Sequence, residues 1–315
     1  MESVRNAFTM DVRRLNVLRQ LHECGTLAAT AEALHLTPSA VSQQLATLSR
    51  EVGAPLLRRQ GRGVRLTPQA HVLLEHATAV QAQIERARAD LAAYEEGHVG
   101  GVTVGAFASA ITRMVAAALL RLHDERPHLA VSVVETDAPR CFAELDGNEV
   151  DVVITVDYRN GPTPGDPRYD RTDLLFDPFD AALHAAHPLV ACREVNLRDL
   201  ARERWIIGGG RGPCAEVSLA ACAAAGFTPD VRHRVDDWSA ALALVDAGAG
   251  VTLVPRLADP RPFSRVRLRA IAGEPPRRSV YAATRSGSQH DPTIAPLLEA
   301  LRTVAGRQSR SGTLP

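Results

Sequence analysis

The chain has 315 residues, of which 45% are hydrophobic and 23% charged, and its formal net charge is zero. This length predicts two or three domains, and the composition excludes a wholly disordered protein. No stretch is long and apolar enough to span a bilayer, and the first ten residues contain no signal-peptide core, so we expect a cytoplasmic protein without a membrane partner.

Positive charge is concentrated at the N-terminal end. Residues 1–70 contain nine arginines and five acidic residues, whereas the remainder contains 27 arginines and 31 acidic residues. A basic end on a neutral chain favours contact with nucleic acid phosphates at that end.

Three short helices are predicted near the N-terminus, over residues 11–23, 26–35 and 36–52. The second and third are separated by a turn of about three residues, as in a helix-turn-helix unit. The third helix begins with Thr37 as its N-cap and Pro38 at the first helical position. One of its faces is apolar and consists of Val41, Leu45, Leu48 and Val52. The opposite face consists of Ser39, Ser42, Gln43, Ala46 and Arg50.

The polar face of this third helix has short hydroxyls and an amide but few charges. Such a face suits the major groove of DNA, although a solvated helix face has a similar composition. We therefore predict base contacts from Ser39, Ser42 and Gln43, with Thr37 and Pro38 at the start of the helix close to the phosphates.

Two short extended segments around a glycine turn follow at residues 55–67, which is the pattern of a wing. Its Arg58, Arg62 and Arg65 put positive charge where the phosphate backbone would pass.

A long helix is predicted from Pro68 to about Glu96. Its apolar residues are spaced alternately four and three apart: Leu73, Ala77, Val80, Ile84, Ala87, Leu91 and Tyr94. This heptad repeat predicts pairing with a second copy, through Leu73, Val80, Ile84 and Leu91. Packing of the helix on its own domain is the alternative.

From residue 98 onward, predicted strands alternate with helices. Strands at 102–105, 130–135 and 151–156 and helices at 109–125 and 139–147 predict a parallel sheet. Residues 157–170 lead into a second lobe, with strands at 174–176, 181–183, 205–207 and 231–235 and helices at 197–203, 215–225 and 238–247. Segments 250–254, 266–268 and 279–284 return to the first lobe, and a helix at 293–304 closes the chain. The polar residues 306–315 are predicted to be disordered.

Two such lobes form a cleft at the carboxyl ends of their strands. The candidate ligand contacts there are Ser109, Thr136, Asp137, Thr155, Gly209, Arg211 and Thr252. Helix N-termini and hydroxyls favour a small polar or anionic ligand. Each residue also has a purely local role available, as an N-cap, a strand residue or a surface charge.

No catalytic or metal-binding residue is predicted. The cysteines have no metal-type spacing, and the glycine-rich segment Gly208–Gly212 is not followed by Lys-Ser or Lys-Thr. Nucleophile-elbow and H-E-x-x-H motifs are absent from the sequence. We therefore expect neither an enzyme nor a cofactor other than a small-molecule effector.

Three N-terminal motifs carry a resemblance to a known family. They are A-x-x-L-x-x-T-P-S-A-V-S-x-Q-L from Ala31, G-A-P-L-L-x-R from Gly53 and G-R-x-V-R-L-T-P from Gly61. Together they resemble the DNA-binding domain of LysR-type transcriptional regulators. Two looser motifs, His187–Leu189 and Gly248–Pro255, resemble the effector-binding domain of the same family.

This resemblance implies an α/β protein with an N-terminal winged helix-turn-helix and two Rossmann-like lobes similar to those of periplasmic solute-binding proteins. The implied domains are 1–68 for DNA binding, 69–97 for the dimerising helix and 98–305 for the effector, before the tail at 306–315. The implied partners are double-stranded promoter DNA with an interrupted palindrome, a small-molecule effector, further copies in a homodimer or homotetramer, and RNA polymerase. Two alternatives stay open: redox sensing through Cys214 and Cys222, and a cytoplasmic solute-binding protein.

Overall fold

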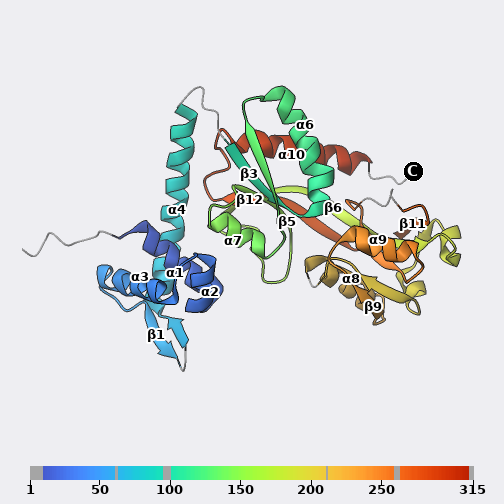
Figure 1. The fold of residues 1–315 in the computed structure, drawn as a ribbon, viewed down its shortest axis with the longest axis horizontal. Helices are drawn as coiled ribbons and strands as arrows, with labels where there is room; N and C mark the ends of the chain where they lie inside the picture. The colour runs from blue at the N-terminus through green and yellow to red at the C-terminus, as the bar shows by residue number, and fades with distance from the viewer. Residues whose placement is uncertain (1–9, 61–62, 95–100, 211, 259–262, 312–315) are drawn as a thin grey trace, which may run out of the picture.

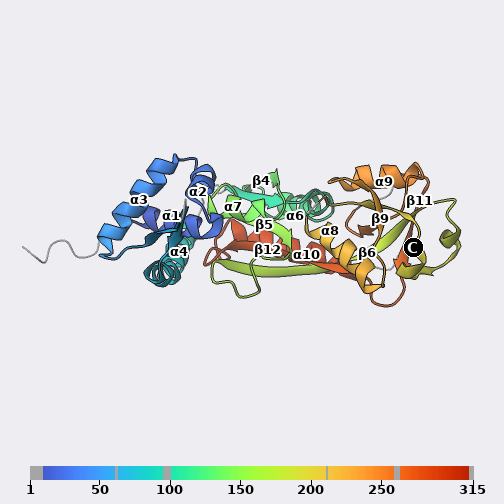
Figure 2. The same ribbon diagram turned by 90° about the horizontal axis from the view of Figure 1, so that it is seen from below.

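The computed structural model describes residues 10–60, 63–94, 101–210, 212–258 and 263–311. A small helical domain and a long helix lie at one end of an elongated molecule, and a larger α/β part lies at the other (Figure 1). The same two parts lie end to end when the molecule is seen from below (Figure 2).

The N-terminal domain begins with α1 (Val12–Cys24), α2 (Leu27–Ala33) and α3 (Pro38–Glu51). Each helix begins where a side-chain oxygen accepts a backbone N–H: Asp11 for α1, Thr26 for α2 and Thr37 for α3. The three helices enclose a common apolar core that includes Leu18, Leu45 and Leu48. The predicted helix-turn-helix is thus present, with helix bounds within two residues of those expected.

The predicted wing is an antiparallel pair of strands, β1 (Leu57–Gln60) and β2 (Gly63–Leu66). Thr67 fastens the wing to the next helix, because its hydroxyl donates to the carbonyl of Pro55 at 2.7 Å and accepts from the N–H of Ala70 at 3.2 Å. That helix, α4, spans Pro68–Tyr94.

The first turns of α4 pack on their own domain. Leu74 and Ala77 are buried in the N-terminal core and Leu73 packs against it, whereas Val80 is 40% exposed. The heptad therefore serves the N-terminal core up to Ala77, and the exposed part of the seam begins at Val80. The side chain of Leu91 lies outside the described set.

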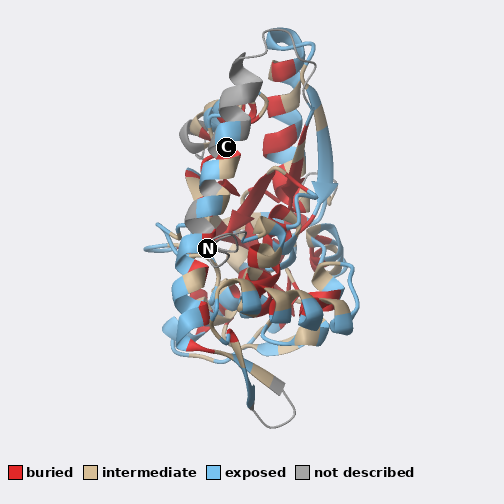
Figure 3. Cartoon of the chain, turned by 90° about the vertical axis from the view of Figure 1, so that its left-hand side faces the viewer, coloured by how far each residue is buried: buried red, intermediate tan, exposed pale blue. Residues whose placement is uncertain are grey.

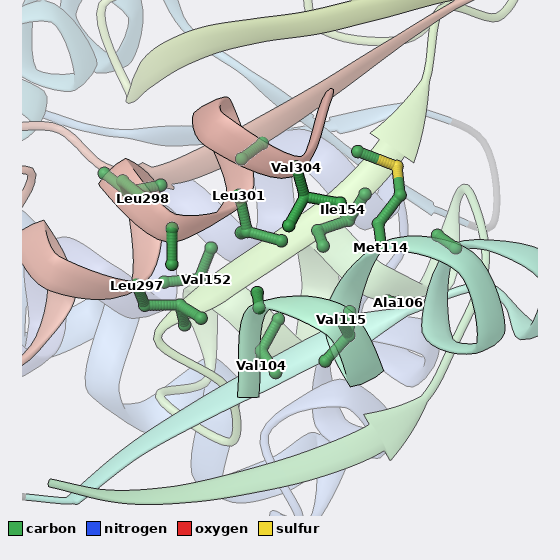
Figure 4. Close-up of a cluster of buried hydrophobic side chains, with 14 of the residues drawn as sticks. Val104, Ala106, Met114, Val115, Val152, Ile154, Leu297, Leu298, Leu301 and Val304 are labelled. Carbon is green, nitrogen blue, oxygen red and sulfur yellow. The ribbon is translucent and has the colours of Figure 1, made fainter. Parts of the chain in front are cut away.

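The first lobe is built on parallel strands β3 (Gly101–Ala106), β4 (Ala130–Glu135) and β5 (Val152–Val156). Its helical segments are α5 (Ala108–Ala110), the π-helical turn η1 (Ile111–Val115), α6 (Ala116–Glu125), α7 (Arg140–Asp146) and α10 (Ile294–Ser311). Figure 4 shows Val104, Val152, Leu297 and Leu301 meeting between the strands and α10. Buried residues gather on the strands and on the inner faces of the helices (Figure 3).

The second lobe contains β7 (Glu194–Val195), β8 (Arg204–Ile207), β9 (Asp230–Arg234), β10 (Thr252–Pro255) and β11 (Val266–Ile271). Its helices are η2 (Pro188–Ala191), η3 (Leu197–Leu200), α8 (Pro213–Ala224) and α9 (Trp238–Asp246). Two long strands, β6 (Tyr169–His184) and β12 (Arg277–Arg285), connect the lobes. They place both lobes on one sheet, of order β4-β3-β5-β12-β6-β11-β7 with β10 also paired to β6, while β8 and β9 pair in parallel beside it.

Three expectations differ from the structure. The separate strands expected at 174–176 and 181–183 are parts of the single strand β6, and the helix expected at 197–203 is one 3-10 turn. The tail expected to be disordered from residue 306 is helical to Ser311, because α10 continues, and residues 312–315 lie outside the described range. Within the described chain, no helix is both long and apolar enough to cross a membrane.

Candidate functional site

The surface of α3 is divided into two faces. Val41, Leu45 and Leu48 are fully buried in the N-terminal core. The residues predicted to contact bases, Ser39, Ser42 and Gln43, are all exposed, as are Ala46 and Arg50 on the same face. This face is free to approach a large partner without unfolding the domain.

The start of α3 is also exposed at Thr37 and Pro38. The Thr37 hydroxyl accepts the N–H of Ala40 at 3.2 Å and lies 2.9 Å from the hydroxyl of Ser39. Thr37 therefore acts first as a helix cap, and its own proton is left to donate to a neighbour or to a phosphate.

The wing places positive charges opposite one another. Arg58 pairs with Arg65 in the strand register, and both side chains are exposed. Like charges at a cross-strand pair repel, so an anion beside them would relieve the repulsion. Arg62 lies outside the described residues.

Between the two lobes lies a cavity of about 490 Å³. It has the size of a site for a small molecule. Its polar lining consists of Ser109, Glu135, Thr136, Asp137 and Arg140 from the first lobe, Cys214, Asp236 and Asp237 from the second, and Arg278 from β12. Phe107, Pro213 and Trp238 add apolar walls, and Gly209 and Gly212 expose backbone.

Arg278 lines this cavity and contacts both lobes. Its guanidinium donates to Asp177 at 3.0 Å, to the Cys214 sulfur at 3.1 Å and to the Ser109 hydroxyl at 3.2 Å. The guanidinium carbon also lies 4.6 Å from the centre of the Phe107 ring. Ser109 and Cys214 belong to different lobes. The hydrogen bonds of Arg278 to both residues therefore depend on how the two lobes are oriented relative to each other.

Two carboxyl groups of the cavity have shifted pKa values. Burial raises the pKa of Asp137, although the N–H of Ala138 and the charge of Arg278 oppose the shift. Hydrogen bonds from the Ser239 hydroxyl and the Ala240 N–H lower the pKa of Asp237, which caps α9. Asp237 is therefore ionised at neutral pH, and ionisation of Asp137 is the less favoured of the two.

The structure brings together four of the seven residues expected in the cleft: Ser109, Thr136, Asp137 and Gly209. Thr155 is buried elsewhere and accepts a hydrogen bond from Cys141 at 3.7 Å, and the hydroxyl of Thr252 donates to the carbonyl of Leu253 at 3.2 Å. Neither of these two threonines lines the cavity, and Arg211 lies outside the described residues.

Among the lining residues, sequence reasoning missed Glu135, Arg140, Asp236, Asp237, Trp238 and Arg278. Asp236 and Trp238 follow β9 as Ser109 follows β3, so the same rule about strand ends could have found them. Arg278 lies inside a strand and reaches Ser109 across 169 residues, which no local pattern reveals. In the described part of the chain, no group of three metal-binding side chains is close enough to hold an ion.

Comparison with protein-family models matches both parts. Residues 12–71 match the model described as "Bacterial regulatory helix-turn-helix protein, lysR family", and residues 95–306 match "LysR substrate binding domain". The chain belongs to the LysR family. It is a transcriptional regulator of LysR type, with a helix-turn-helix DNA-binding domain and an effector-binding domain.

Individual relatives agree with this LysR assignment along most of the chain. The transcriptional regulator MetR of Escherichia coli (strain K12) is 28% identical over 94% of this chain and 91% of its own. A probable hydrogen peroxide-inducible genes activator of Mycobacterium avium is 30% identical over 84% of each. GltC of Bacillus subtilis (strain 168), a transcriptional dual regulator, is 27% identical over 78% of this chain and 81% of its own. These relatives are named as regulators of transcription, not as enzymes.

Solved structures share the LysR fold. Full-length OxyR C199D from Pseudomonas aeruginosa superposes with a TM-score of 0.61 at 20% identity, covering 94% of this chain and 95% of the other. CbnR in complex with its target DNA gives a TM-score of 0.56 at 24% identity, covering 94% and 100%.

Proposed function

We propose that this LysR-type regulator reads promoter DNA with the exposed face of α3 and holds the phosphates with the wing. The observation that supports this most strongly is the division of α3 into a fully buried apolar stripe and an exposed face of Ser39, Ser42 and Gln43. Arg58 and Arg65 of the wing supply charge without base specificity. Thr37, Pro38 and Arg62 are the remaining phosphate contacts that we propose from the sequence.

The test is a gel-shift titration of Gln43→Ala on the DNA that flanks its own gene and on random DNA. An amide that bonds a base edge contributes about 1–3 kcal/mol of discrimination, so specific binding should fall by roughly 5- to 150-fold while random DNA is bound as before. Gln44→Ala is the matched control. Gln44 is the next residue on the same helix but lies off the exposed face and is half-buried.

An equal loss on specific and random DNA for Gln43→Ala, or an equal loss of specific binding for both variants, would contradict base reading by Gln43.

The effector is proposed to bind in the cavity between the lobes. Ser109 and Asp137 lie on one side, Gly209 and Asp236 on the other, and Arg278 contacts both. A ligand that touches both sides gains its contacts in one relative orientation of the lobes, so it must favour that orientation. The ligand would thereby change the geometry in which paired DNA-binding domains meet their half-sites.

We propose that two copies pair through the exposed part of the α4 seam, beginning at Val80, and that two such dimers form a tetramer. Pairing two reading domains multiplies an otherwise weak contact with DNA and matches an interrupted palindrome. Promoter DNA is in the cytoplasm of a bacterium, where RNA polymerase is the further partner we expect.

Redox sensing is the second candidate, because Cys214 lies against Arg278 and a relative is named for its response to hydrogen peroxide. The geometry favours it less. Burial raises the pKa of both Cys214 and Cys222, that of Cys222 to about 12, so both stay protonated thiols at neutral pH. The two lie eight residues apart on α8, about 12 Å along its axis, and a disulfide between them would need that helix to unwind.

A further inference from the structure

The lining of the cavity between the lobes contains more acidic than basic side chains. Glu135, Asp137, Asp236 and Asp237 all face it. Two arginines also line it, but each forms an ion pair with a carboxylate: Arg278 with Asp177 at 2.9 Å and Arg140 with Glu144 at 2.9 Å. Neither of those partner carboxylates lines the cavity.

The lining therefore contains four carboxylates, and each of its two described arginines pairs with a carboxylate outside the lining. Arg211 follows Gly210 in the sequence, and counting its charge in full still leaves an excess of three. A cavity with such a lining attracts positive charge and repels anions.

A second, independent feature is the side chain of Thr136. This residue lines the cavity and is 4% exposed, yet its hydroxyl has no hydrogen-bond partner within the described chain. A buried hydroxyl without a partner is unfavourable. The hydroxyl oxygen itself is enclosed, so an N–H group of a ligand would bond it once the cavity wall shifts on binding.

We propose that the effector is a small organic cation, a primary amine or a guanidine, whose charge lies between Asp137 of the first lobe and Asp236 of the second. This inference rests on the proposed binding of an effector in the cleft. Gly210 allows Asp236 to take its place, because a Cβ on Gly210 would lie 1.7 Å from the Asp236 Oδ1 atom. The described carboxylates are not grouped closely enough to hold a metal ion, so the cation is an organic one.

The sequence favoured a small polar or anionic ligand, and the same geometry disfavours the anionic form. That expectation relied on helix N-termini, but the N-terminus of α9 is already occupied by the carboxylate of its own cap, Asp237. An anion would also meet three further carboxylates at the cavity wall.

A cation at this place would couple binding to the arrangement of the lobes. Asp137 and Asp236 come from different lobes, and both line the cavity. A positive charge between them would attract both carboxylates toward a common centre. The lobes are then held in the orientation that keeps both carboxylates close to the ligand.

The test uses three probes that share a four-carbon chain and differ in charge: diaminobutane, butanediol and succinate. Calorimetry and thermal shift are measured on the full-length protein. Diaminobutane should bind and raise the melting temperature, and butanediol and succinate should do neither. Asp137→Asn and Asp236→Asn should each weaken diaminobutane binding by about tenfold or more, which corresponds to one lost charge pair in a partly buried site.

Asp230→Asn is the matched control, because Asp230 begins β9 in the same lobe but is exposed outside the cavity and pairs with Arg232 at 2.9 Å. It should leave diaminobutane binding unchanged.

Binding of succinate that Ser109→Ala abolishes would overturn the cationic class while leaving the effector cleft in place. Binding of none of the probes would also overturn the cationic class. Diaminobutane binding that both cleft variants retain would show a non-specific cation effect and overturn it too. The gel-shift with Gln43→Ala is independent of all these outcomes.

Discussion

The guanidinium of Arg278 is buried where the two lobes meet, and its partners come from three different segments of the chain: Ser109, Asp177 and Cys214. Because Asp177 is itself 2% exposed, its charge depends on Arg278 for compensation. A buried ion pair adds little stability compared with an apolar pair, but the loss of one partner leaves the other uncompensated.

Arg278→Met keeps an unbranched side chain that reaches about as far as the Nε atom, and it removes the guanidinium charge. We expect the free energy of unfolding to fall by about 3–5 kcal/mol, because the Asp177 carboxylate stays buried without a cation. Urea denaturation measures this. Arg277→Met, at the exposed neighbouring position, should change it by less than about 0.5 kcal/mol.

Adding Asp177→Asn to Arg278→Met should recover part of the loss, since the stranded charge is then gone. Equal stability of the two single arginine variants would refute the compensation argument.

At the scale of residues, the sequence predicts what depends on local order. The buried and exposed faces of α3 follow from a period of 3.6 residues, and Ser109 follows from its place between a strand and a helix. The meeting of Arg278 with Ser109, or of Asp137 with Asp236, depends on how the lobes fold onto each other. Local sequence patterns therefore do not distinguish these residues from other charged residues as members of the site.

At the scale of elements, α4 contacts two different domains along its length. Leu74 and Ala77 complete the N-terminal core, and Glu85 lies 3.7 Å from Arg285 of the effector-binding domain. Ile84 lines a cavity together with Arg19, Arg168 and Arg285, so a charge placed there would act on these arginines as well as on a dimer seam. Val80 is the better position at which to test the dimer seam, because it is exposed and belongs to the heptad.

Val80→Asp should convert the dimer to monomers. A carboxylate buried in a helix pair without a partner costs about 3 kcal/mol or more, which raises the dissociation constant by roughly a hundredfold. Sedimentation velocity over a range of concentrations measures this change. Val72→Asp, the same substitution at an exposed valine outside the heptad, serves as the control. A Val80→Asp protein that still sediments as a dimer, or a Val72→Asp protein that also dissociates, would rule out the proposed seam.

The elements that the sequence predicted least well have a common cause. Pro178 and its polar neighbour Asp177 divide residues 169–184 into two apparent strands, yet β6 continues through them with Pro178 paired to Arg277. The carbonyl of Pro178 also accepts the N–H of Arg256 at 3.0 Å. Tertiary partners therefore override the local breaker, and none of them is near in sequence.

At the scale of the whole molecule, the DNA-binding domain is docked directly on the first lobe of its own chain. Arg19 of α1 donates to Asp146 at 2.7 Å, and Arg168 donates to Glu23 at 2.7 Å. Asp146 is the last residue of α7, and Arg140 at the start of that helix lines the cavity between the lobes. The short helix α7, which faces the N-terminal domain in Figures 1 and 2, thus joins the cleft to α1 within one subunit.

The docking contact should weaken as pH rises, and Glu23 is the reason. Burial, with the nearby Asp146 carboxylate, raises the pKa of Glu23 to about 7, although Arg19 and Arg168 oppose the shift. When the domains separate, the pKa of Glu23 returns to its ordinary value near 4.5. The docked state then holds more protons than the separated state between these values. Its stability is therefore fully present below 4.5 and is lost as pH rises through about 7, by a few kcal/mol at most.

Hydrogen exchange of the α1 amides at pH values on either side of 7 measures this loss of docking. Exchange, corrected for its intrinsic pH dependence, should become faster at the higher pH in the wild type and should not change in Glu23→Gln, which is neutral throughout. Burial lowers the pKa of neighbouring His22, which acts in the opposite direction below 6.5, and the comparison of the two proteins cancels its contribution. Glu32→Gln on the exposed surface of α2 should behave as the wild type does. The same pH dependence in wild type and Glu23→Gln would mean that Glu23 does not control the docking.

Since α7 joins this contact to the cleft, a loosened contact should also leave the DNA-binding domain less responsive to the arrangement of the lobes.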